Sequence, residues 1–393
     1  MALSIRPKVY QLPTYSLTGD LLGFLRCGLQ YRYSRIGRLP PSRPVQLWFG
    51  EFIHGVMEEA YRRYRDSKQK RKPSLPPWPT GLLDDIRKLI EDRLAVRGLV
   101  AWDPELKVLG YRRAEVAIQE LGPHLFPLIA EAEVRLSGAR MLPPIASSLQ
   151  FRVADRYEMA GIVDVLTQVQ LQDPALKGNP LLELITRSLP QQPPSEFEVI
   201  VDYKGMRRPP VDKTTGGLWT QYAWQVLTYA QLRKRQAGSR PVIAGVLVYI
   251  NELFPTRSDL ELLKKEVATG GTDVLPSAGT EAEKVLKAWS SKAPLPTIPW
   301  AFRLARAIRV VPVTDAAITA AVGGFDIVVK DIETCRGREV HGTPVLSAWT
   351  RNSTDESTCV VCDSRTYCPD YQKKYAAQHG EQQPRLPGRK SIV

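Results

Sequence analysis

Two acidic segments of the chain carry the side chains that are best suited to metal-dependent chemistry. Asp202 and Lys204 stand two residues apart after the apolar run Val199–Val201, and side chains two apart on a strand leave the same face. Asp164 stands in an equally apolar segment, 160–166. If the two strands are neighbours, Asp164 and Asp202 converge and form a site of hard oxygen ligands that suits Mg²⁺ or Mn²⁺.

A structural interpretation of the same three residues stays open at this point. Asp202 and Lys204 could form an ion pair at the end of a strand, and Asp164 could cap a turn. The pattern D-x-K is short, so taken alone it does not decide between catalysis and structure.

Two further pairs of polar residues accompany these acids. His54 follows Gly50 by four residues in a segment, 45–64, whose apolar residues recur at steps of three and four, which is typical of an amphipathic helix. A glycine at that position lets another backbone come close to the histidine. Gln225 and Tyr229 are four residues apart on a second predicted helix, so they share one face.

The order of these motifs is specific. Along the chain they are G-x-x-x-H, G-x-x-D, D-Y-K and Q-x-x-x-Y, which resembles the RecB-like branch of the PD-(D/E)xK nuclease superfamily across residues 50–229. The resemblance implies an α/β fold with a restriction-endonuclease-like core, a central mixed β-sheet flanked by helices, together with helical insertions. One departure is the gap of 38 residues between Asp164 and Asp202, which makes residues 168–196 an insertion at the tip of the hairpin.

The resemblance also implies a role for each motif residue. Four groups would bind or contact the divalent metal: His54, Asp164, Asp202 and the backbone carbonyl of Tyr203. Lys204 would orient or activate the attacking water and stabilise the charge that grows on the phosphate. Gln225 and Tyr229 would position the scaffold or the nucleic-acid backbone.

Most of the cysteines gather late in the sequence. A C-x₂-C-x₅-C motif is formed by Cys359, Cys362 and Cys368. Three thiolates need a fourth ligand to complete a metal site. By spacing alone, Cys335 could complete a zinc site, with His341 as a substitute ligand, and Cys27 is the other cysteine available.

The surroundings of Cys27 favour a different metal centre. Residues 15–33, which include Phe24-Leu-Arg-Cys27 and Tyr31-Arg-Tyr33, resemble the N-terminal segment of iron–sulfur nucleases such as AddB and related CRISPR-associated exonucleases. In that group one early cysteine joins a late trio with this spacing. The resemblance implies a 4Fe–4S cluster on Cys27 and the trio that staples the two ends of the chain together and lowers the entropy of the unfolded chain. Cys335 would then be a small buried hydrophobe.

The charge balance points to a polyanionic partner. The 393 residues include 54 Lys and Arg against 41 Asp and Glu, a net charge of +13, which favours nucleic acid. Arg207 and Arg208 closely follow Lys204 and could bind phosphates beside the scissile bond, where Tyr229 would also contact the nucleic acid. The sequence has no run of about 20 apolar residues and no signal peptide at its start, so we expect a soluble, cytoplasmic protein without a membrane partner.

Apolar patterning also predicts the order of elements and segments. We expect helices at 45–64, 82–100 and 218–235, and strands at 132–136, 151–153, 160–169, 198–203, 242–250 and 308–313. The expected division is an N-terminal segment with the first cluster cysteine at 1–44, a helical region with the histidine motif at 45–135, a nuclease core at 136–250, an inserted arm and the remaining core strand at 251–330, a C-terminal cysteine region at 331–375 and a flexible basic tail at 376–393.

These observations lead to one principal hypothesis and two alternatives. The principal hypothesis is a Mg²⁺- or Mn²⁺-dependent deoxyribonuclease that acts on single-stranded DNA or duplex ends in repair, recombination or anti-phage defence. By analogy only, its partner would be a helicase or another protein of a defence system. The alternatives are a catalytically weak DNA-binding or assembly subunit with the same fold, and a zinc-stabilised structural protein.

Overall fold

The computed structural model describes residues 12–39, 45–69, 74–101, 103–211, 217–376 and 378. The chain forms two compact units that are each built from separate stretches of sequence. The larger unit consists of Arg43–Leu136 and Gly161–Ala321, and the smaller unit of Met1–Ser42, Ser137–Ala160 and Val322–Val393. Most of the predicted tail 376–393 lies outside the described residues, as do residues 1–11 and 40–44 of the predicted N-terminal segment.

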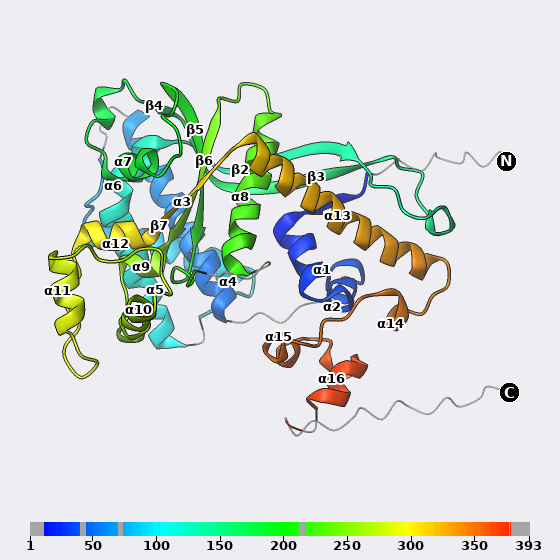
Figure 1. Ribbon diagram of the computed structural model, residues 1–393. Helices are drawn as coiled ribbons and strands as arrows, with labels where there is room; N and C mark the ends of the chain where they lie inside the picture. Colours follow the sequence, from blue (N-terminus) through cyan, green and yellow to red (C-terminus); the bar gives the residue numbers. More distant parts are fainter. Residues whose placement is uncertain are drawn as a thin grey trace. The chain divides into compact units, whose positions relative to one another are not determined.

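A mixed β-sheet forms the centre of the larger unit (Figure 1). Its strands are β3 (Arg156–Thr167), β5 (Glu196–Lys204), β6 (Val242–Tyr249) and β7 (Ile308–Pro312), in that order across the sheet. β5 pairs antiparallel with β3 and parallel with β6, and β7 pairs antiparallel with β6. Because β5 and β6 lie inside the sheet, their sequences are nearly continuous apolar runs.

Two long helices cover opposite faces of this sheet (Figure 1). α3 (Val45–Gln69) buries Phe52 and Val56 completely in the main core, which also contains apolar residues of β5 and β6. On the other face, α8 (Leu218–Lys234) packs Val226 against Leu247 of β6. The predicted helix at 45–64 is therefore confirmed and continues for another turn, since its apolar stripe is what the sheet buries.

The remaining elements of the larger unit are helices around the sheet and insertions into it. They are α4 (Thr80–Val96), α5 (Pro104–Val116), α6 (Gly122–Leu125), β4 (Val169–Gln170), α7 (Pro180–Arg187), α9 (Ile250–Leu253), α10 (Arg257–Thr269), α11 (Glu281–Ala288) and α12 (Trp300–Ala307). β4 and α7 occupy the predicted insertion 168–196, where β4 pairs with the start of β5. α10 and α11 have a small core of their own, centred on Leu260, Leu286 and Trp289.

The smaller unit brings segments from the two ends of the chain into contact. Its elements are β1 (Thr14–Ser16), α1 (Leu22–Arg26), α2 (Gly28–Tyr31), α14 (Val345–Ala348), α15 (Glu356–Val360) and α16 (Pro369–Lys374). β2 (Ile129–Met141), β3 and α13 (Asp315–Val340) contribute residues to both units. The β1 strand pairs in parallel with residues 158–160 of β3.

One predicted strand of the smaller unit is wrong. Residues 151–153 have no regular secondary structure, because Arg152 anchors this stretch through its side chain instead of through backbone pairing. Its guanidinium forms an ion pair with the buried Glu333 of α13, which also accepts a hydrogen bond from Tyr15.

None of the helices in the described part of the chain combines the length and the apolar composition needed to cross a bilayer.

Candidate active site

The two acids predicted from the sequence meet where β3 and β5 separate. The backbone pairing of these antiparallel strands ends at Val165 opposite Val201, so the next residues on the two strands are Asp164 and Asp202. The Asp164 carboxylate accepts a hydrogen bond of 2.8 Å from the backbone N–H of Tyr203, which fixes it beside the end of β5. The structure therefore brings together two residues that are 38 positions apart in the sequence.

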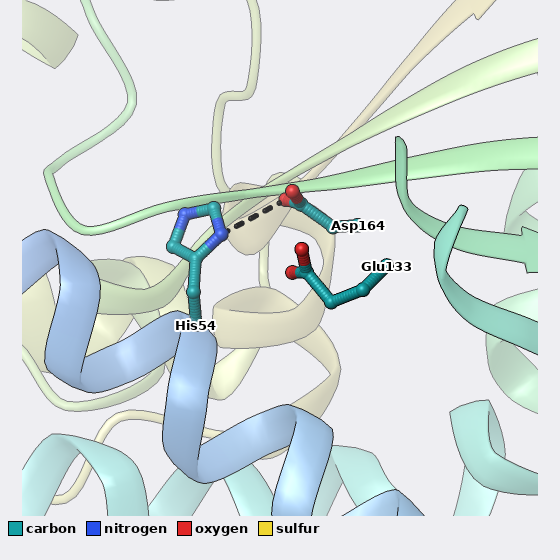
Figure 2. A group of neighbouring side chains, drawn as sticks. All are labelled: His54, Glu133 and Asp164. Atoms are coloured by element: carbon teal, nitrogen blue, oxygen red, sulfur yellow. Dashed lines mark ion pairs between the residues drawn. The ribbon is translucent and has the colours of Figure 1, made fainter. Parts of the chain in front are cut away.

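A third carboxylate, which the sequence analysis missed, completes this side of the site. Single ligand atoms of His54, Glu133 and Asp164 all lie within 4.8 Å of one another, and Nδ1 of His54 is 3.3 Å from Oδ2 of Asp164. Figure 2 shows the three side chains converging from α3, β2 and β3. A group of two carboxylates and one imidazole at this spacing can hold a metal ion.

A hydrogen-bonded chain extends the site toward α8. Nζ of Lys204 is 2.5 Å from Oδ2 of Asp202 and 2.8 Å from Oε1 of Gln225. The Gln225 amide donates to Oδ1 of Asp202 at 2.8 Å and to the Tyr229 hydroxyl at 3.2 Å. Lys204 also lies 4.3 Å from the centre of the Tyr222 ring. Because every polar end of Gln225 is engaged, α8 holds the lysine in one position beside the acid.

The glycine before His54 lies at a close backbone approach, as the sequence suggested, but the packing does not require glycine at that position. A Cβ atom added at Gly50 would meet nothing within 4 Å. Another backbone does come close to Gly50, but the contact requires a glycine at Gly205, directly after Lys204, where an added Cβ would lie 3.2 Å from the Phe49 ring and 3.5 Å from Cα of Gly50. The glycine that lets β5 end against α3 is therefore Gly205.

The electrostatics of the site call for a cation. Burial alone would lower the pKa of His54, but Asp164 and Asp202 outweigh it and raise the pKa to about 9. Partial desolvation, with Asp164 and Glu58 nearby, raises the pKa of Glu133 to about 7. Burial also raises the pKa of Asp202, against the opposing effect of Lys204. Clustered carboxylates with raised pKa values repel one another, and a bound dication would relieve that repulsion.

The residues present fit a divalent metal. Carboxylate oxygens are the preferred ligands of Mg²⁺, and Mn²⁺ also accepts an imidazole nitrogen. His54, Glu133 and Asp164 would hold the ion, and Asp202 lies next to them, close enough to Asp164 for the two charges to interact. Tyr203 contributes its backbone N–H to Asp164, whereas its carbonyl as a metal ligand stays a prediction.

The two arginines that follow Lys204 are engaged by carboxylates. Arg207 pairs with Glu266 at 3.0 Å. Arg208 is buried and donates from Nε to Asp273 at 2.8 Å, and Nη2 contacts the second oxygen of the same carboxylate. These ion pairs attach the end of β5 to the inserted arm. A role of Arg207 and Arg208 in phosphate binding stays a prediction.

Four of the five cysteines are neighbours in the smaller unit. Burial raises the pKa of Cys359, and the nearby thiols of Cys368, Cys27 and Cys362 raise it further. The N-terminal helices approach the C-terminal segment closely here, since the Leu29 N–H donates to the Thr350 carbonyl at 2.9 Å. Cys335 is buried in α13. Among the described residues, no three cysteines have their sulfur atoms within 4.8 Å of one another.

Comparison with known proteins agrees with this geometry. Residues 19–173 match the family model of the PD-(D/E)XK nuclease superfamily. The match contains His54, Glu133 and Asp164 and ends before Asp202 and Lys204. It supports a metal-dependent nuclease domain, and the mixed sheet flanked by helices is consistent with a restriction-endonuclease-like fold. No curated protein matched the chain.

Proposed function

We propose that this protein is a Mg²⁺- or Mn²⁺-dependent deoxyribonuclease of the RecB-like, AddB-like type that hydrolyses single-stranded DNA or duplex ends. The observation that carries the proposal is the convergence of His54, Glu133 and Asp164 within 4.8 Å, beside the ion pair of Asp202 and Lys204. Hydrolysis of a phosphodiester needs an activated water and compensation of the charge on the phosphate. This site offers ligands for a dication and a fixed ammonium group for those two tasks.

Each side chain has a part in the proposed reaction. When bound, the divalent metal would supply a nucleophilic hydroxide and polarise the phosphate oxygens. Lys204, held by Asp202 and Gln225, would orient the water and donate hydrogen bonds to the developing oxyanion. Gln225 accepts a hydrogen bond from the Lys204 ammonium group and so holds its orientation. Tyr229 accepts a hydrogen bond from the Gln225 amide and holds Gln225 in turn. Gln225 and Tyr229 are thus positioning residues.

We also propose a 4Fe–4S cluster in the smaller unit, ligated by Cys27, Cys359, Cys362 and Cys368. Four thiolates are the usual ligands of such a cluster, and the electrostatic coupling of these four thiols supports their proximity. A zinc ion would draw the sulfur atoms closer together, because its Zn–S bonds are only about 2.3 Å long. Iron and zinc analysis of protein prepared without oxygen distinguishes the two metal centres.

The biological setting is a proposal by analogy. A basic chain of net charge +13 suits DNA, and related nucleases work with a helicase or within a defence system, which makes repair, recombination and anti-phage defence the settings to examine. Protein captured with such a motor protein would support this part of the proposal.

The proposed function is tested with labelled single-stranded DNA and purified protein in Mn²⁺, Mg²⁺ or EDTA. We expect cleavage with either metal and none in EDTA. Asp202→Asn and Lys204→Ala should each reduce the rate by on the order of 100-fold or more. The exposed ion pair of Lys88 and Asp92 on α4 provides matched controls, and Lys88→Ala and Asp92→Asn should cleave normally.

Two results would contradict the proposal. Undiminished cleavage by Asp202→Asn would remove the catalytic site described here. Tight, salt-sensitive binding that leaves the DNA intact would indicate the catalytically weak binding subunit instead. Oligonucleotides blocked at the 5′ or the 3′ end, used in the same assay, distinguish exonuclease from endonuclease action.

A further inference from the structure

A polar pocket opens along β7, the edge strand of the sheet in the larger unit. It has a volume of about 380 Å³, and Arg208, Trp219, Asp273 and Arg309 give it its polar character. Two guanidinium groups against one carboxylate leave this lining with a net positive charge. The catalytic site does not use the pocket, although both are in the same unit.

Arg309 is the second guanidinium of this pocket, and Asp273 acts on it only through longer-range electrostatics. Arg309 is only 8% exposed to solvent, and its guanidinium carbon lies 3.5 Å from the centre of the Trp219 ring. Nη1 donates to the Trp219 carbonyl at 2.9 Å, and within the described residues no carboxylate forms an ion pair with it. Burial lowers the pKa of Arg309, against the opposing effect of Tyr249. A buried guanidinium without a carboxylate is costly unless an anion binds.

Most N–H donors of the neighbouring Arg208 are already engaged within the protein. Asp273 binds Nε and Nη2 of Arg208, and Nη1 donates to the Ile308 carbonyl at 2.9 Å. The same contacts engage both oxygens of Asp273, which reduces its repulsion of an anion. Arg309 therefore remains as the donor, and the half-buried Trp219 ring holds its guanidinium plane from one side.

The strand register places this pocket close to the catalytic acids. Asp202 pairs with Leu247 on β6, and Leu247 pairs with Arg309 on β7. Directly paired residues point to the same face of a sheet, and two strand spacings separate these backbones by about 10 Å. Lys204 is also linked to the pocket through the strand register. It pairs with Tyr249 on β6, and the centre of the Tyr249 ring lies 5.8 Å from the guanidinium carbon of Arg208. A short stretch of single-stranded DNA covers such a distance.

We propose that this pocket binds a phosphate of the DNA strand whose scissile bond lies at Asp164 and Asp202, with Arg309 as the phosphate ligand. The inference rests on the proposed nuclease function and adds a binding site outside its catalytic residues. A guanidinium offers the paired donors that match phosphate oxygens. The site gives the strand a second fixed point and so sets its direction across the sheet.

The first test changes the charge of the pocket without touching its core. Ser188 is an exposed residue of the lining, and Ser188→Glu and Ser188→Gln add side chains of equal size that differ in charge. Binding of a fluorescent single-stranded oligonucleotide is measured in EDTA, where no cleavage takes place. We expect Ser188→Glu to weaken binding at least five-fold, whereas Ser188→Gln stays within two-fold of the unchanged protein. Equal affinities for the two variants would overturn the proposal.

The second test removes the proposed ligand itself. Arg309→Met should weaken binding about ten-fold and lower the slope of log affinity against log salt by about 0.7, the value for one phosphate contact with a single strand. Arg112→Met, which removes an exposed charge on α5, should leave both quantities unchanged. If Arg309→Met does not fold, the Ser188 pair decides the question alone.

Two further measurements identify the source of the phosphate and distinguish failure of the pocket proposal from failure of the nuclease proposal. A deoxynucleoside monophosphate that binds in a Ser188→Glu-sensitive way, together with an unchanged oligonucleotide slope in Arg309→Met, would assign the pocket to free nucleotide and overturn the strand proposal. Cleavage in Mn²⁺ is measured separately. If the protein cleaves DNA normally but neither Ser188→Glu nor Arg309→Met changes DNA binding, only the pocket proposal is wrong. If Arg309→Met weakens DNA binding but the unchanged protein does not cleave DNA, only the proposed nuclease function is wrong.

Discussion

Glu133 has a backbone conformation that residues with a side chain seldom adopt. Its φ is +54°, in the left-handed region, which costs about 1–2 kcal/mol for a residue other than glycine. Strain of this kind persists where the surrounding structure enforces it and is concentrated at functional sites. Here it turns the carboxylate toward His54 and Asp164, which is the reason we include Glu133 among the metal ligands.

The role of Glu133 is tested by Glu133→Gln. The substitution keeps the size of the side chain and removes a charged ligand, so we expect the Mn²⁺ concentration for half-maximal cleavage to rise on the order of ten-fold or more. Glu131→Gln removes the same charge from an exposed position two residues away on the same strand and should leave that concentration unchanged. An equal response of the two variants would remove Glu133 from the site.

The sequence could predict the acids but not this glutamate. Asp164, Asp202 and Lys204 stand out because each interrupts an apolar run, and a buried strand seldom contains a charge without a reason. Glu133 lies in a segment where charged residues alternate with apolar ones, which is the ordinary pattern of a strand with one solvated face. The place of Glu133 in the site depends on its own φ value and on the approach of α3, and neither can be predicted from residue type.

The strands and helices around the site were predictable to different degrees. The buried strands β5, β6 and β7 and the amphipathic helix α3 have strong patterns, and the structure has them at the expected places. The length of β2 was not predictable, because only 132–136 of Ile129–Met141 have a strand pattern. The pairing of β3 with β5 across a 38-residue gap came from the order of motifs, since strand patterns alone do not specify partners.

Contact between β3 and α8 depends on a glycine. A Cβ atom added at Gly161 would lie 2.5 Å from the Tyr229 ring, so Gly161→Ala should displace Tyr229 and disturb Gln225 and Lys204. We expect a loss of about 1–3 kcal/mol in the free energy of unfolding, together with slower cleavage. Gly50→Ala in α3, where an added Cβ meets nothing, should instead be neutral or stabilising by up to about 1 kcal/mol. Thermal unfolding of both variants tests this prediction, and an unchanged melting temperature in Gly161→Ala would contradict it.

An ion pair in the smaller unit gives its stability a definite pH dependence. A hydrogen bond from Arg32, with a further one from Trp349, lowers the pKa of Glu339. A lowered folded pKa means that the stabilisation is complete above the ordinary glutamate value near 4.3 and is lost as the pH falls through the folded value. Glu339→Gln should therefore cost about 1 kcal/mol at pH 7, and the difference from the unchanged protein should shrink below pH 4. A difference that is constant with pH would contradict the assignment.

Across the whole chain, long-range contacts join segments that lie far apart in the sequence. Residues before Ser42 and after Val322 contribute to one compact unit, and the four neighbouring cysteines lie at its two sequence ends. A link between residues this distant removes much conformational freedom from the unfolded chain. The motif resemblance could predict this link, whereas the division into two units built from separate stretches was not evident from the sequence.

The proposed cluster makes this long-range link dependent on iron. Cys27→Ser and Cys362→Ser should lower the iron content and the absorbance near 400 nm of protein prepared without oxygen, and should lower the melting temperature by several degrees. Cys335→Ser, which changes the buried cysteine outside the group, should keep its iron. A colourless unchanged protein that contains stoichiometric zinc would show that the cluster proposal is wrong.

The location of the metal is the most direct test of the account. Crystals of the protein soaked in Mn²⁺ should give an anomalous difference peak at the manganese edge within about 2–2.5 Å of ligand atoms from His54, Glu133 and Asp164, with Asp202 beside it. Asp164→Asn crystals treated in the same way should lose the peak. A manganese peak only at another position, or the absence of a peak at this position in the unchanged protein, would contradict the central claim.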